Sequence, residues 1–333
     1  MPRQPDPPPL PEPRAARADQ RLTAFTAPLA QPSGEPNLNV GELVTAVHRI
    51  IPPAARSTAA RVPGSTRSPT HHHPEEKTVE TDMPDYAASW ETYWTAAETA
   101  WEPSLWDTEP ELASAVDLPR FAQFLGPGRC LLNLGCGNGS QTRHLARHIE
   151  RVMGADASAA AVRAASAQDP HTEYLVLDMF DSPAVRALHD RMGDVDLYMR
   201  TVLHQILPEH RPAFAESLRT LLGATGVLAL VELSPGAEEH LDNLVARYGA
   251  PPSLSRVLSA GIRPGGVDQH EALALLRPDR FTVLAKSDAK VHLTYRLPDG
   301  NRVGLPAYFT VLGPRRLGEV IDLAPSPSRC GRR

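Results

Sequence analysis

From residue 130 onward, short apolar runs alternate with longer segments that carry apolar residues at helical spacing. Leu145 and Ile149, for example, are four residues apart in a segment that begins at Ser140, so they share one face of a predicted helix. Ser158 is a suitable N-cap before an alanine-rich segment of high helix propensity. The alternation predicts βαβ units and a mainly parallel sheet, with strands at 130–134, 152–155, 174–177, 195–199 and 227–231 and helices at 140–149, 158–167, 183–191, 212–222, 237–248 and 268–276.

The pattern changes towards the C-terminus. Three β-rich runs at 281–285, 291–297 and 308–312 follow one another with little helix between them. Asp299 and Gly300 form a strong hairpin signal. We therefore expect the sheet to end in antiparallel strands.

The first quarter of the chain differs in composition. Residues 1–82 contain fifteen of the 34 prolines and no sustained apolar period, so this segment is predicted to be disordered. His71, His72 and His73 lie in it, either as a loose metal site or without a structural role. A chain that starts at Met83 is expected to keep full activity and thermal stability.

Charge and composition narrow the class of partner. Positive and negative charges cancel within residues 1–82, so the rest of the chain carries the whole net charge of −5. A body without a basic face argues against a nucleic acid and favours a small-molecule or protein substrate. No apolar run approaches the roughly 18 residues that span a bilayer, and no signal peptide is recognisable, so a cytoplasmic location is expected. The three cysteines lack metal-ligand spacing, and no metal is expected.

An aromatic face recurs at helical spacing within the segment 89–112, at Trp90, Tyr93, Trp94 and Trp101. Two interpretations stay open. The rings pack on the sheet as ordinary core, or the helix is a lid that excludes water from a reacting group and holds an apolar substrate.

A glycine-rich turn lies between the first predicted strand and the first predicted helix. Glycine allows the backbone to approach a ligand closely and to direct amide N–H groups at it. The glycines are Gly135, Gly137 and Gly139, whereas a dinucleotide-binding fingerprint would require glycine at position 140, which is Ser140. The turn therefore reads Gly-x-Gly-x-Gly.

This turn, with an acid after the second strand and an antiparallel end, makes residues 86–315 resemble the class I S-adenosylmethionine-dependent methyltransferases. Val-Leu-His-Gln-Ile after the fourth strand and Val-Glu-Leu-Ser at the fifth resemble actinobacterial small-molecule enzymes of this family. The resemblance implies an α/β, Rossmann-like fold with a seven-stranded, mainly parallel sheet, antiparallel C-terminal strands and an N-terminal helical lid. The expected domains are a disordered segment at 1–82, the lid at 83–125, the methyltransferase domain at 126–316 with a substrate cap at 234–268, and a flexible tail at 317–333.

The resemblance also implies a cofactor site for S-adenosylmethionine, with S-adenosylhomocysteine as the product. Asp156 follows the second strand, where a carboxylate can bind both ribose hydroxyls, and Asp178 matches the family's acid for the adenine. The alternatives are a surface aspartate and a turn cap. Asn133 departs from the family, which has an acid there, and brings no charge to the methionine ammonium. The cofactor-binding residues are expected to be Asn133, Gly135, Cys136, Gly137, Asn138, Gly139, Asp156, Ala157, Asp178, Met179 and Arg200.

The expected reaction is methyl transfer to an oxygen, nitrogen or sulfur atom of a small-molecule acceptor, mainly by positioning and desolvation. Arg200, Thr201 and His204 follow the fourth strand and should border cofactor and substrate. His204 is a candidate base for an acceptor with a proton to lose, since histidine titrates near neutrality, although a structural hydrogen bond is the alternative. Glu232 is a second candidate. Two other classes stay open, an NAD-dependent oxidoreductase and a protein that binds S-adenosylmethionine without catalysis.

Overall fold

In the computed structural model of the chain, the described residues are 84–98, 103–262, 265–276, 280–315 and 321–322. Several predictions lie outside them, namely those for the segment 1–82 with its three histidines, the alternative start at Met83, the lid residue Trp101 and most of the tail 317–333. In the part of the chain that the structure describes, no helix has the length and apolar character needed to cross a membrane.

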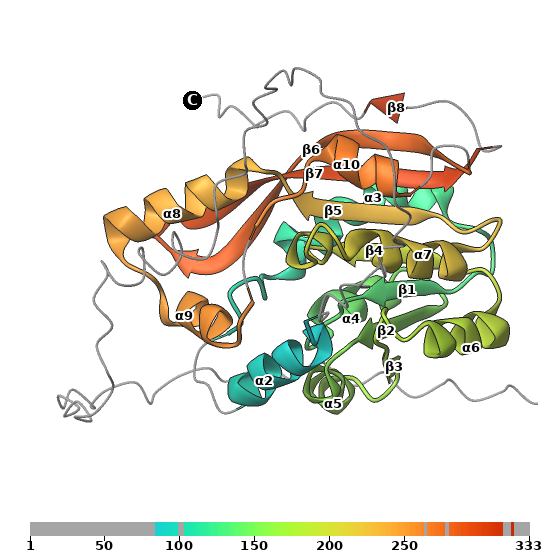
Figure 1. Cartoon of the computed structure of the whole chain (residues 1–333), viewed down its shortest axis with the longest axis horizontal. Helices are drawn as coiled ribbons and strands as arrows, with labels where there is room; N and C mark the ends of the chain where they lie inside the picture. Colours follow the sequence, from blue (N-terminus) through green and yellow to red (C-terminus); the bar gives the residue numbers. More distant parts are fainter. Residues whose placement is uncertain (1–83, 99–102, 263–264, 277–279, 316–320, 323–333) are drawn as a thin grey trace, which may run out of the picture. The chain divides into compact units, whose positions relative to one another are not determined.

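A mixed sheet runs through the described residues, with five parallel strands followed by an antiparallel hairpin (Figure 1). The strand order is β3-β2-β1-β4-β5-β7-β6-β8, so strands are added first on one side of β1 and then, from β4 onward, on the other. A crevice opens at such a switch point, outside the carboxyl ends of the strands. The parallel strands are β1 Leu131–Leu134, β2 Val152–Asp156, β3 Glu173–Val176, β4 Asp196–Arg200 and β5 Leu228–Leu233, which confirms the mainly parallel α/β fold.

The antiparallel strands β6 Phe281–Arg296 and β7 Arg302–Pro314 are longer than predicted. β6 joins two of the predicted runs into one strand. Lys286, Asp288 and Lys290 between those runs are exposed and alternate with partly buried residues. Such a one-sided strand pattern is typical of an antiparallel sheet, and a search for apolar runs overlooks it.

The two ends of this hairpin are also defined. The predicted turn at Asp299-Gly300 is confirmed, and Gly300 adopts a φ of 84°, in the region that glycine favours. At the other end, β8 Ile321–Asp322 pairs in parallel with β6. β8 adds a short eighth strand within the segment that was expected to be a flexible tail.

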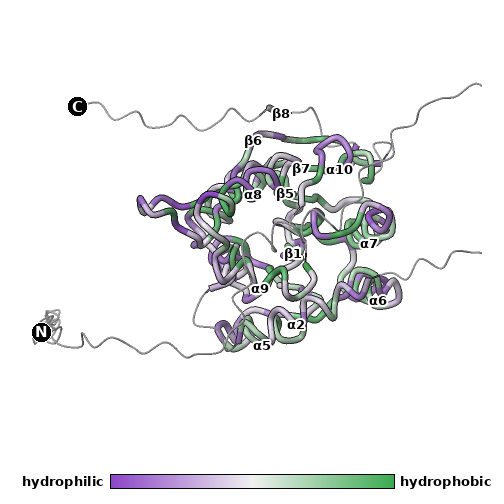
Figure 2. Tube along the Cα trace, turned by 60° about the vertical axis from the view of Figure 1, so that its left-hand side comes forward, coloured by the Kyte–Doolittle hydropathy of each residue, from purple (hydrophilic) through white to green (hydrophobic). Residues whose placement is uncertain are grey.

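Helices cover both faces of the parallel strands. α4 Ser140–Ala146 and α5 Ala159–Gln168 pack into one hydrophobic core with Leu131 and Tyr198, and the alternate strand residues Leu132 and Leu197 face a second core. In Figure 2, α7 carries both hydrophobic and hydrophilic residues, as expected for a helix with one face on a sheet. The helices of the second core are α6 Ser182–Met192, α7 Arg211–Leu222 and α10 Gln269–Leu275.

The first helix of the described chain, α2 Tyr86–Glu98, lies beside α5 in Figures 1 and 2. Glu91 of α2 accepts hydrogen bonds from the Ser158 hydroxyl at 2.7 Å and from the Ala160 N–H at 2.9 Å. These bonds, the one from Ala160 first, lower the pKa of the Glu91 carboxyl. Ser158 is itself the predicted cap of α5, because its Oγ accepts from the Ala161 N–H at 3.1 Å. The N-terminal segment is therefore fixed to the sheet domain by polar contacts.

The remaining helices differ from the prediction in instructive ways. Within the segment 89–112, the aromatic residues predicted at helical spacing lie on α2 as far as Glu98, and a short 3-10 turn, η1 Pro110–Leu112, follows among the described residues of that range. α3 Ser114–Phe121 was missed, since Pro119 and polar positions obscure its period. α4 ends three residues before the predicted boundary at Ile149. In the predicted substrate cap, α8 Gly236–Tyr248 was expected and α9 Pro252–Ser259 was not.

Candidate active site

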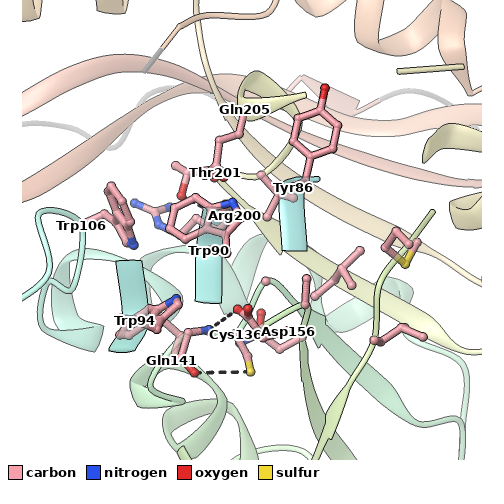
Figure 3. Close-up of a pocket in the computed structure, with 18 of the residues that line it drawn as sticks. Tyr86, Trp90, Trp94, Trp106, Cys136, Gln141, Asp156, Arg200, Thr201 and Gln205 are labelled. Atoms are coloured by element: carbon pink, nitrogen blue, oxygen red, sulfur yellow. Dashed lines mark hydrogen bonds between the residues drawn. The ribbon is translucent and has the colours of Figure 1, made fainter. Parts of the chain in front are cut away.

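A pocket lies at the carboxyl ends of the parallel strands, where the N-terminal segment meets the sheet. Figure 3 shows Trp90, Trp106 and Arg200 close together, with Cys136 and Asp156 lower in the same pocket. Other lining residues come from α2 and the segment that follows it, from β1 and the glycine-rich turn, from the segments after β2, β3 and β4, and from β6. They include Tyr86, Trp94, Asp107, Asn133, Gly135, Gly137, Asn138, Ala157, Asp178, Met179, Phe180, Thr201, Gln205 and Val291.

The glycine-rich turn requires its glycines for two reasons. Gly135, Gly137 and Gly139 all have positive φ, at 70°, 54° and 78°. A Cβ added to Gly137 would also lie 2.8 Å from the Trp94 ring. Gly139 does not line the pocket, and a Cβ there would lie 2.9 Å from the Ala165 Cβ, so its role in the structure is packing against α5.

Asp156 joins the end of β2 to this turn. Its Oδ2 accepts a hydrogen bond from the Gly137 N–H at 2.9 Å, and its Oδ1 accepts from the Ser158 N–H at 3.0 Å. The side chain is 8% exposed, and burial raises the pKa of its carboxyl, against the lowering effect of these N–H donors. Asp156 is therefore a pocket-lining residue and not a surface aspartate.

Asp178 occupies the corresponding position after β3. Its Oδ1 accepts from the Phe180 N–H at 2.9 Å, so it forms the turn cap that was the alternative interpretation, and it lines the pocket as well. Phe180 stacks against Tyr86 of α2, with ring centroids 5.1 Å apart. The Tyr86 hydroxyl lies 2.9 Å from His210 Nδ1 and accepts from the Leu207 N–H at 3.1 Å. The start of α2 thereby contacts the far side of the pocket.

Asp107 contacts the glycine-rich turn from the N-terminal segment. Its Oδ1 accepts from the Ser140 hydroxyl at 2.9 Å and its Oδ2 from the Asn138 side-chain amide. Beneath the turn, the Asn133 amide donates to Thr142 Oγ1 at 2.8 Å. Asp107 was not among the expected site residues. The sequence signal that was available is its place in a Trp-Asp pair after the aromatic segment.

Arg200 is held by a buried carboxylate that the sequence did not single out. Arg200 Nη1 and the Tyr198 hydroxyl both donate to Asp117 Oδ2, each at 2.8 Å. Asp117 is 2% exposed and belongs to α3, which was not predicted. Burial, and then the Asp117 charge, raise the pKa of Tyr198 well above its ordinary value. The next residue, Thr201, has a φ of 58°, rare for a β-branched residue, and it lines the pocket.

His204 and Glu232 contact each other but do not line the pocket. His204 Nδ1 lies 2.6 Å from Glu232 Oε1, and the buried carboxylate also accepts from the N–H groups of Leu203 at 2.7 Å and Leu233 at 2.8 Å. All of these partners lie in the segment after β4 or at the end of β5. This contact matches the alternative of a structural hydrogen bond for His204, because both side chains are engaged away from the pocket lining. A general base at either residue stays a prediction.

The rings of the aromatic segment differ in their surroundings, and the role of a lid stays a prediction. Tyr93 is fully buried and does not line the pocket, so it is a core residue; its ring centroid lies 5.5 Å from those of Trp90 and Trp94 and 5.4 Å from that of Trp106. The three tryptophans line the pocket. Trp106 was not named as a lid residue, yet it lines the pocket, whereas Tyr93 was named and does not.

Comparisons with known proteins identify the family of this chain. A family model described as a methyltransferase domain matches residues 132–230, from β1 to β5. The crystal structure of an S-adenosylmethionine-dependent methyltransferase from Anabaena variabilis is 36% identical with a TM-score of 0.66, and the match covers 70% of this chain and 97% of that one. The chain therefore belongs to the S-adenosylmethionine-dependent methyltransferases.

A curated relative is more distant. An uncharacterized methyltransferase of Synechocystis is 31% identical over 110 residues, which are 33% of this chain and 49% of the relative. The chain thus matches about half of the length of that protein.

Proposed function

We propose that this chain transfers a methyl group from S-adenosylmethionine to a small-molecule acceptor bound between the aromatic residues of the N-terminal segment and Arg200. The observation that carries the proposal is the single pocket in which the glycine-rich turn and the carboxylates after β2 and β3 meet Trp90 and Trp106. When bound, S-adenosylmethionine supplies an activated methyl group on a sulfonium centre.

The residues present suit this cofactor. Three carboxylates, Asp107, Asp156 and Asp178, line the pocket, against Arg200 as the one cationic side chain among its described lining residues. Such a surplus of negative charge favours a ligand that carries a sulfonium and an ammonium. Asp156 is proposed to bind the ribose hydroxyls, and Asp178 with Met179 the adenine. The backbone from Gly135 to Asn138 is proposed to bind the carboxypropyl group.

The acceptor side of the pocket supports catalysis by positioning. Trp90, Trp106 and Tyr86 exclude water and hold an apolar body, while Arg200 and Gln205 offer polar contacts. No histidine lines the pocket among the described residues. The acceptor is therefore proposed to be an atom that is already nucleophilic, such as a neutral amine, a thiolate or another ionised group, so that no protein base is needed.

Calorimetry followed by turnover tests this function. The full chain is titrated with S-adenosylhomocysteine and, separately, with NADH, and then incubated with S-adenosylmethionine and a panel of aromatic small molecules while product formation is followed by mass spectrometry. Binding of S-adenosylhomocysteine with turnover of at least one acceptor is the expected result. Binding of NADH alone would overturn the proposal in favour of an oxidoreductase, and binding without any turnover would favour a non-catalytic protein.

A further inference from the structure

Strand β1 carries a neutral residue where the cofactor site of the family has an acid. S-adenosylmethionine carries an α-ammonium. The resemblance to the family implies an acid on the first strand that offers a negative charge to this group. This chain has Asn133 at that position. The Asn133 amide donates to Thr142 Oγ1 at 2.8 Å, and a neutral amide brings no charge to a cation.

The described pocket-lining residues offer three carboxylates as replacements. Asp156 accepts from the N–H groups of Gly137 and Ser158 at the end of β2, and Asp178 caps the turn after β3. Both therefore lie at the carboxyl ends of strands on one side of β1. Asp107 is the third, and it is the one that contacts Asn138 and Ser140 at the end of the glycine-rich turn.

Several contacts fix Asp107 in this position. The Gln141 side-chain amide donates to the Thr108 carbonyl at 2.9 Å, and the Ser114 hydroxyl donates to Gln141 Oε1 at 2.7 Å. On the other side, the Trp106 ring packs against Trp90 with centroids 5.4 Å apart. Contacts of Thr108 and Trp106 thus fix the chain on both sides of Asp107. Each oxygen of the Asp107 carboxylate has one protein donor. A carboxylate has about four lone-pair sites, so it can accept further hydrogen bonds.

We propose that Asp107 is the carboxylate that binds the α-ammonium of S-adenosylmethionine, in place of the acid that the first strand lacks. The inference rests on the proposed function, since it concerns the same cofactor. It assigns part of the cofactor site to the segment before the sheet. The segment that contributes Trp106 to the acceptor side would then also bind the amino-acid end of the cofactor.

Two ligands separate this role from a structural one. S-adenosylhomocysteine carries the α-ammonium, whereas 5′-methylthioadenosine has the same nucleoside and no amino-acid group. Asp107→Asn keeps the size of the side chain and removes its charge. The variant is expected to bind S-adenosylhomocysteine at least about tenfold more weakly, as befits the loss of one charged hydrogen bond, with unchanged affinity for 5′-methylthioadenosine. Glu111→Gln, an exposed acid in the same segment, is the matched control and should change neither.

A second substitution tests the replacement directly. Asn133→Asp restores an acid on the first strand, where Thr142 can donate to it, and the double variant with Asp107→Asn is expected to recover most of the lost affinity. Equal losses for the two ligands in Asp107→Asn, no loss for either, or no recovery in the double variant would overturn the inference while leaving the proposed function intact. Failure of the unaltered chain to bind S-adenosylhomocysteine would overturn both.

Discussion

Arg200 Nη1 lies 2.8 Å from Asp117 Oδ2, so the guanidinium that lines the pocket is paired with a carboxylate from a helix that precedes the sheet in the chain. The side chain of Arg200 is 11% exposed and that of Asp117 is 3% exposed. The position of the Arg200 side chain in the pocket therefore depends on a residue more than eighty positions earlier.

Replacement of Asp117 should destabilise the fold strongly. Asp117→Asn removes the charge that compensates Arg200, and breaking a buried ion pair from one side costs about 3–5 kcal/mol. Urea unfolding followed by tryptophan fluorescence measures the effect. The matched control is Asp190→Asn, at an exposed position on α6, and it should change the free energy of unfolding by less than about 0.5 kcal/mol. A small loss for Asp117→Asn would show that Tyr198 and water satisfy Arg200 without it.

Gly137→Ala should impair cofactor binding more than its backbone strain explains. The positive φ alone costs an L-residue about 1–2 kcal/mol, and the added Cβ would also meet the Trp94 ring at 2.8 Å. Gly128→Ala has a similar φ of 69° and open space around the Cβ, so it shares the first cost only. We expect Gly137→Ala to lose more stability than Gly128→Ala and to bind S-adenosylhomocysteine more weakly. Equal behaviour of the two variants would contradict the close contact with Trp94.

Ligand binding should protect one buried cysteine and leave another unchanged. Cys136 and Cys130 are 7% and 5% exposed, and burial raises the pKa of both thiols, so both should react slowly with iodoacetamide near neutral pH. Only Cys136 lines the pocket. S-adenosylhomocysteine is expected to slow the labelling of Cys136 several-fold, as measured by peptide mass spectrometry, without a matching change at Cys130. Uniform protection of both would indicate general stabilisation of the fold instead.

Acidification should destabilise the protein partly through His292. Burial first, and then the charges of Arg200, Lys290 and Arg302, lower the pKa of His292 below 6.5. The unfolded chain then binds the proton more readily, so stability is lost as the pH falls from about 6.5 towards the folded-state pKa. His292→Gln should reduce the difference in unfolding free energy between pH 7.5 and pH 5. His171→Gln, at an exposed position, should not; a slope unchanged by His292→Gln would assign the effect to other groups such as His144, whose pKa burial also lowers.

The strands and the glycine-rich turn could be predicted from the sequence, whereas contacts between distant segments could not. The apolar runs that became β1, β2, β4 and β5 are largely buried on both faces, and such runs stand out along a chain. Strand β6 was divided because its middle is exposed on one side. Asp117 carries no local signal and Asp107 only its place in a Trp-Asp pair, since their importance comes from partners about eighty and thirty residues away. His204 has the right chemistry and chain position, but its hydrogen bond to Glu232 depends on the packing of β5.

The contact between Trp94 and the glycine-rich turn has a consequence for the protein during its synthesis. Trp94 lies against Gly137, and Trp90 and Trp106 line the same pocket, yet all three tryptophans precede every strand of the sheet. During translation these rings emerge before the sheet, so until β1, β4 and the turns that follow them have been made they can pack only against one another. Translation therefore exposes the aromatic side of the pocket first, and a chaperone that recognises nascent apolar segments would encounter this protein at 90–106.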